Sequence, residues 1–130
     1  MKRFALEKLK IWKEKPDRKP LIIRGARQVG KTWLMKEFGK TCFEKTAYVN
    51  FDSNPRMQQL FEGEIDVERV ILAISAETGV SINCTDTLLI FDEVQEVPKA
   101  LGSLKYFCEN APEYAIVAAG SLLGVAMHKG

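Results

Sequence analysis

The sequence is poor in residues that form disulfides or bind metals through nitrogen and sulfur. Its three cysteines, Cys42, Cys84 and Cys108, lie far apart without a C-x-x-C pair, and His128 is the only histidine. An odd number of widely spaced cysteines favours buried, reduced thiols over a disulfide framework or a zinc site. A single histidine near the end of the sequence is interpreted as a surface residue, not as a ligand or a base.

Long apolar runs are also missing. No run approaches the roughly 18 residues that a membrane-spanning helix needs. The basic N-terminus is not followed by the apolar region of a secretory signal. We therefore expect a cytoplasmic protein with no membrane partner. A length of 130 residues, with 46% hydrophobic and 28% charged residues, suits one globular domain over residues 1–130.

The clearest pattern among the residues that are present lies at 25–32. These residues read Gly-Ala-Arg-Gln-Val-Gly-Lys-Thr and match G-x-x-x-x-G-K-[ST], the phosphate-binding P-loop (Walker A), at every fixed position. A short apolar run at 21–23 precedes the pattern, and a segment with helical spacing follows it from Trp33. This is the strand–loop–helix order that the motif requires. The alternative is a glycine turn before a helix with a chance lysine.

The residue types in this segment suit the phosphates of a nucleotide. Gly25 and Gly30 allow the loop to wrap with its N–H groups inward, and the first turn of the next helix adds further amides. Lys31 is predicted to place its charge on the β- and γ-phosphates, and Thr32 to offer its hydroxyl to Mg²⁺. Arg27 has a second interpretation as a solvated loop residue. The predicted nucleotide contacts are Gly25, Ala26, Arg27, Gln28, Val29, Gly30, Lys31, Thr32 and Trp33.

A second pattern combines an apolar strand with two acids. Residues 88–91 are apolar and are followed by Asp92 and Glu93, which matches the Walker B pattern. Such a run predicts a parallel strand covered on both faces, whose carboxyl end opens into the crevice where these sheets bind ligands. We predict that Asp92 holds Mg²⁺, through water, and that Glu93 activates or positions a water near the γ-phosphate. An acidic surface turn is the alternative for the pair alone.

The rest of the chain alternates between helical and strand patterns. Helices are expected at 2–14, from 31 to a C-terminal Gly39, from Asn54-Pro55 to about 61, from Asp66 to Gly79, and from 98 to 112 with Leu101, Leu104 and Cys108 facing inward. Strands are expected at 21–24, 45–52, 87–91 and 114–119. This alternation predicts an α/β domain with a parallel sheet.

Three polar residues lie toward the end of the expected second strand. Tyr48, Asn50 and Asp52 are placed near the mouth of the crevice. Asn50 or Asp52 is a candidate for orienting water or metal. Strand packing and turn capping are the default roles of all three.

Three segments together resemble one family. They are residues 25–32, Ile90-Phe91-Asp92-Glu93-Val94-Gln95 and Ala118-Ala119-Gly120-Ser121-Leu122-Leu123-Gly124. Over nearly its whole length the chain is similar to bacterial and archaeal AAA-type ATPases in which a C-terminal domain of unknown function follows the ATPase domain. The resemblance implies a three-layer α/β/α P-loop NTPase fold with strand order 5-1-4-3-2. It also implies that Ser121 occupies the sensor-1 position beside the γ-phosphate or the attacking water, for which a turn or helix cap is the alternative.

The same resemblance implies elements that do not occur before Gly130. These are a fifth strand, a helical lid with a sensor-2 arginine, and the C-terminal domain. We therefore expect an N-terminal fragment of a longer protein, with four core strands and the first of them at an edge that invites association. Without an identified arginine finger, this chain alone is expected to bind nucleotide weakly and to hydrolyse little.

The charge distribution raises nucleic acid as a further candidate partner. Residues 1–40 contain 13 Lys and Arg against 4 Asp and Glu, whereas residues 41–130 contain 6 against 13. A basic N-terminal third can attract nucleic acid, but it can equally surround a triphosphate site and decorate a solvated helix. The net charge of +2 is not that of a dedicated nucleic-acid binder.

Two functions fit these motifs. The first is ATP binding with Mg²⁺-dependent hydrolysis, in which Lys31, Glu93 and Ser121 are the predicted catalytic residues. The second is a nucleotide-gated switch that presents a surface to a protein partner, alone or in an oligomer. Glu93 favours hydrolysis, and the absence of an Asn/Thr-Lys-x-Asp motif favours adenine over guanine. A metabolite kinase is disfavoured, because the Asp-Glu pair is adjacent and no lid is evident.

Overall fold

The computed structural model describes residues 2–23 and 30–120, with side chains described from residue 6 onward. The elements in chain order are α1 (Lys2–Glu14), β1 (Leu21–Ile23), α2 (Lys31–Cys42), β2 (Lys45–Asn50), α3 (Pro55–Leu60), α4 (Val67–Thr78), β3 (Thr87–Asp92), the 3-10 helix η1 (Val94–Glu96), α5 (Pro98–Asn110) and β4 (Ala115–Ala119). Within these described ranges, no helix has the length and apolar character needed to cross a membrane.

The described strands form one parallel sheet. Their order is β1-β4-β3-β2, which confirms the strand order expected for the first four strands of a P-loop NTPase. Because the strands are parallel, the carboxyl ends of β1, β4 and β3 lie at the same edge of the sheet. Asp92 and Glu93 of the second predicted motif lie at this edge, where sheets of this kind bind ligands.

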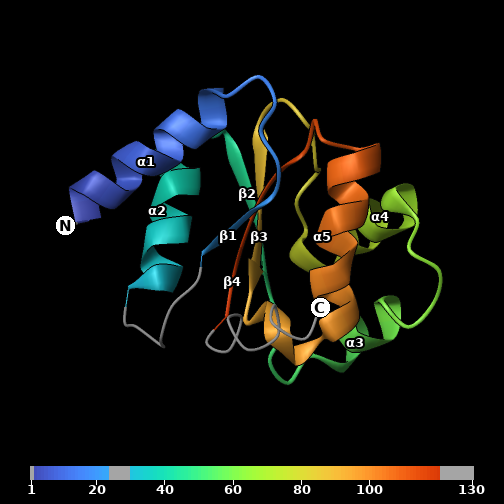
Figure 1. The fold of residues 1–130 in the computed structure, drawn as a ribbon. Coiled ribbons are helices and arrows are strands. Elements are labelled where there is room, and N and C mark those ends of the chain that lie inside the picture. Colours follow the sequence, from blue (N-terminus) through green and yellow to red (C-terminus); the bar gives the residue numbers. More distant parts are fainter. Residues whose placement is uncertain (1, 24–29, 121–130) are drawn as a thin grey trace.

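Helices cover both faces of the sheet (Figure 1). Helices α1 and α2 pack on one face, and α3, α4 and α5 pack on the other, so the domain has three layers. Alternation along β3 divides its side chains between the two cores. Leu88 and Ile90 lie in the core with α1 and α2, whereas Leu89 and Phe91 lie in the core with the other three helices. Every residue of β3 is buried, as its continuous apolar run predicted.

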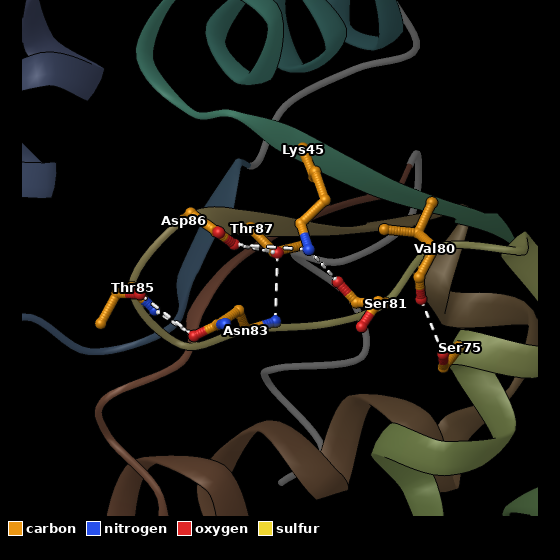
Figure 2. A network of polar contacts seen from close by, with 8 residues as sticks. All are labelled: Lys45, Ser75, Val80, Ser81, Asn83, Thr85, Asp86 and Thr87. Atoms are coloured by element: carbon orange, nitrogen blue, oxygen red, sulfur yellow. Dashed lines mark hydrogen bonds and ion pairs between the residues drawn. The ribbon is translucent and has the colours of Figure 1, made fainter.

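A polar network at the amino ends of β2 and β3 holds the segment 80–86, which precedes β3 (Figure 2). The Lys45 ammonium donates to the Ser81 carbonyl oxygen at 2.6 Å and lies 3.8 Å from the Asp86 carboxylate. The Thr87 hydroxyl donates to Asp86 at 2.7 Å and accepts from the Asn83 amide at 3.1 Å. Since Lys45 and Thr87 are the first paired residues of the two strands, this network helps to set their register.

The C-terminus of α2 differs from the expectation. The helix does not end at Gly39 but continues to Cys42, with Phe43 as its C-cap. Gly39 is fully enclosed, and a Cβ there would overlap the hydroxyl of Thr46 and lie 3.3 Å from Leu88 Cδ2. The glycine therefore allows the helix to lie close to the sheet and does not end the helix.

We expect Gly39→Ala to lower the free energy of unfolding by about 1–3 kcal/mol, the usual cost of overpacking a core. Gly102→Ala in α5 is the matched control, because the added Cβ meets no atom within 4 Å. Helix propensity alone then predicts that the control gains up to about 1 kcal/mol. Urea unfolding of both variants measures the two effects. Equal gains in stability would show that the helix does not approach the sheet so closely.

Two other expectations, for α5 and for β2, need correction. In α5 the fully buried apolar residues are Ala100, Leu104 and Phe107, whereas Leu101 and Cys108 are only half-buried. The helix is therefore rotated relative to the expected stripe, and its small residue Ala100 faces the core. Strand β2 ends at Asn50, before the expected Asp52, because the Asn50 side chain accepts the Asp52 amide at 2.9 Å and turns the chain.

The expected ends of α3 and α4 are confirmed. The Asn54 side chain accepts the Met57 amide at the start of α3, and Gly79 ends α4 with φ 74° in the left-handed region. Asp66 does precede α4, but its carboxylate makes no capping hydrogen bond there. Asp66 is nevertheless the N-cap residue of α4, as expected, and its carbonyl accepts the Val70 amide at 2.9 Å.

Candidate functional site

The structure describes six of the predicted site residues. Gly30, Lys31, Thr32 and Trp33 lie at the start of α2, and Asp92 and Glu93 lie at the end of β3. The other predicted site residues, Gly25, Ala26, Arg27, Gln28, Val29 and Ser121, lie outside the described residues, and their roles stay predictions.

The start of α2 depends on a glycine. Gly30 is the N-cap residue and has φ 116°, a left-handed conformation that residues with a Cβ rarely adopt. The first intrahelical hydrogen bond runs from the Leu34 amide to the Gly30 carbonyl at 2.8 Å. Gly30 has no side chain with which to cap the helix. The amides in the first turn of any helix have no acceptor within that helix, so this end of α2 favours negative charge.

Asp92 connects the two predicted motifs. The Thr32 hydroxyl donates a hydrogen bond of 2.7 Å to Asp92 Oδ2, although the two residues are 60 positions apart. A second hydroxyl, that of Tyr48, donates to the same oxygen at 2.7 Å, and the Glu93 amide donates to Oδ1 at 3.0 Å. Asp92 is only 5% exposed, so its charge is held by these donors with little help from water.

Tyr48 is the site residue that the sequence reasoning did not identify. It was placed near the crevice, but with strand packing as its expected role. In the structure, burial raises the pKa of the Tyr48 phenol, and the hydrogen bond to Asp92 and the charge of that carboxylate raise it further. The phenol therefore keeps its proton at neutral pH and remains a donor to Asp92. Strand alternation is only part of the signal, because Tyr48 and Asp92 are seen to lie on the same face of neighbouring strands once the register of those strands is known.

Glu93 has an unusual backbone and a specific partner. Its φ of 53° is left-handed, which is uncommon for a residue other than glycine and occurs often at functional sites. The Gln95 side-chain amide donates to Glu93 Oε1 at 2.8 Å. The Gln95 oxygen Oε1 is buried and has no hydrogen-bond partner among the residues that the structure describes. The turn after β3 thus holds the half-buried Glu93 carboxylate beside Asp92 and not among the core residues.

The hydroxyl oxygen of Thr32 and the carboxylate oxygens of Asp92 suit Mg²⁺ as ligands. Hydroxyl and carboxylate oxygens are hard ligands, and Mg²⁺ usually takes only one or two of them from protein together with water and substrate phosphates. In the described part of the chain, no group of three or more His, Cys, Asp or Glu side chains is arranged to hold a metal. The Thr32–Asp92 pair therefore suits a metal that is bound jointly with a phosphate ligand, not one held in a closed protein cage.

Comparison with known proteins agrees with this geometry. A family model described as an AAA domain matches residues 17–130. The chain belongs to the AAA domain family. No curated protein gives a significant match. The AAA domain match starts in the turn before β1 and includes both motifs, so it suggests a nucleotide-binding function of the ATPase type.

Proposed function

We propose that this AAA domain binds ATP together with Mg²⁺ and hydrolyses it. The observation that carries the proposal is the 2.7 Å hydrogen bond between Thr32 and Asp92. It joins Thr32 in the first turn of α2 to Asp92, the last residue of β3. Neither residue alone is informative, but their contact at the carboxyl edge of a parallel sheet is the arrangement that a metal–nucleotide site requires.

Each residue has a role that follows from its chemistry. Lys31 and the amides at the start of α2 would hold the phosphate charge, together with the proposed contacts at residues 25–29. Thr32 and Asp92 would hold Mg²⁺, which when bound neutralises charge on the phosphates. Glu93 would accept a proton from the attacking water or orient it, and Ser121 would contact the γ-phosphate or that water.

A nucleotide-gated switch is the second candidate, and one contact favours it. Gln95 donates to Glu93 Oε1 at 2.8 Å, so one of the two carboxylate oxygens that could accept a proton from water is already occupied. A domain in which this contact persisted would bind nucleotide and change shape without rapid turnover. Whether Gln95 keeps this contact with Glu93 when nucleotide is bound therefore distinguishes a switch from an enzyme.

Phosphate release from ATP separates the two candidates. The wild-type chain is incubated with ATP and excess MgCl₂, with the protein in excess over nucleotide so that slow turnover is visible. We expect release that stops when EDTA removes the metal. Binding of ATP without any phosphate release would favour the switch, and release that is insensitive to EDTA would contradict the proposed metal site.

A further inference from the structure

The contacts of Tyr48 reach beyond ordinary strand packing. Its hydroxyl donates to Asp92 Oδ2, the same oxygen that accepts from Thr32, and both distances are 2.7 Å. The two donors come from different elements, β2 and α2, and the acceptor comes from β3. Asp92 is thus held from two sides, and its second oxygen is held by the backbone of its own turn.

The ring of Tyr48 has a separate contact. The Lys36 ammonium lies over it, 4.1 Å from the ring centroid, in a cation–π arrangement. Lys36 is one helical turn beyond Thr32, so the ring and the hydroxyl of Tyr48 contact the same side of α2. Two roles are therefore possible for Tyr48, holding α2 against the sheet through its ring or holding the Asp92 carboxylate through its hydroxyl.

We propose that Tyr48 is a positioning residue for the metal, whose hydroxyl orients the Asp92 carboxylate toward Mg²⁺. The inference rests on the proposed function. Tyr48 does not touch the metal itself but acts through Asp92. Carboxylates that bind metals are commonly held by hydrogen bonds of this kind, and removing such a partner typically weakens metal affinity about 10- to 100-fold.

The local structure explains why one hydroxyl matters. Without it, Oδ2 keeps only the Thr32 donor, and that hydroxyl is itself a proposed metal ligand. Asp92 is the last residue of β3, so its side chain has no following strand residue to hold it in place. The Tyr48 hydroxyl is then the one side-chain donor to Asp92 among the described residues that has no proposed contact with the metal.

The test compares ADP binding with and without metal. Calorimetry measures the Kd of ADP once with excess MgCl₂ and once with EDTA. The ratio of the Kd in EDTA to the Kd in MgCl₂ reports how strongly the protein couples metal to nucleotide. Tyr48→Phe keeps the ring and removes only the hydroxyl. We expect this variant to lower the ratio about tenfold and to leave ADP binding in EDTA unchanged.

Two control variants separate positioning from packing. Lys36→Gln removes the charge over the ring and leaves the hydroxyl, and Tyr114→Phe makes the same chemical change at a ring that packs on Phe107. Neither should alter the ratio. An unchanged ratio in Tyr48→Phe would overturn the inference, and a higher ratio would overturn it too, because the hydroxyl would then compete with the metal. If the wild-type chain shows no effect of metal on ADP binding, the proposed function itself fails.

A second measurement keeps Tyr48 in place and therefore does not require Tyr48→Phe to fold. The chain is labelled with fluorotyrosine, and its three tyrosine signals are assigned with Tyr106→Phe and Tyr114→Phe. We expect MgCl₂, added in the presence of ADP, to shift the fluorine resonance of Tyr48 and not those of the other two. A Tyr48 resonance that does not respond to the metal would overturn the inference.

Discussion

Replacing Lys31 with alanine is expected to weaken ATP binding by about 100-fold. Lys31 is the first residue of α2 and follows the left-handed Gly30, so this residue lies at the helix end that favours anions. Charge-assisted hydrogen bonds each contribute about 1.5–3 kcal/mol, and about 2.8 kcal/mol corresponds to a 100-fold change in Kd. Calorimetry with ATP and MgCl₂ measures the loss.

Lys40→Ala is the matched control for this variant. Lys40 lies on the same helix but is exposed in its last turn, far along the axis from the proposed phosphate site. The control should bind ATP like the wild-type chain. Equal losses in both variants would mean that Lys31 acts only through the general positive charge of the N-terminal third.

Replacing Glu93 with glutamine is expected to reduce hydrolysis by about 10²- to 10⁴-fold and to leave ATP binding unchanged. Glutamine keeps the size of the side chain and an oxygen that can still accept from Gln95, but it cannot take a proton from water. The loss should therefore be confined to the chemical step. Phosphate release and calorimetry on the same sample measure the two effects separately.

Glu96→Gln makes the same change three residues further along the chain. Glu96 is exposed, and its carboxylate lies 3.4 Å from the same Gln95 amide. The control should keep normal hydrolysis. If Glu93→Gln retained full phosphate release, Glu93 would not be the group that activates water, and the switch would become the better account of any nucleotide binding.

The sequence predicted the fold because its signals are local. The buried run before Asp92, the glycines at 30 and 79 and the Asn54-Pro55 helix start each act within a few residues of one another. Their periodicity and turn chemistry do not depend on distant parts of the chain. The parallel sheet and the position of Asp92 at its edge followed from these signals.

The features that were missed depend on contacts between distant segments. Gly39 looks like a helix stop in the sequence, and only its close approach to Thr46 on the next strand explains why a glycine stands inside the helix. The hydrogen bond from Tyr48 to Asp92 depends on the register of β2 against β3, which strand patterns alone do not fix. The bond from Gln95 to Glu93 is local, but it depends on a left-handed backbone at Glu93 that no glycine in the sequence signals.

The most direct test is a calorimetric titration of the wild-type chain with ATP, ADP and GTP, each with MgCl₂ and with EDTA. The hydrogen-bonded pair of Thr32 and Asp92 predicts that both adenine nucleotides bind more tightly with Mg²⁺, and the lack of a guanine-reading motif predicts that GTP binds less well. A folded chain that binds none of the three nucleotides, or binds them equally with and without metal, would contradict a metal–nucleotide site between α2 and β3.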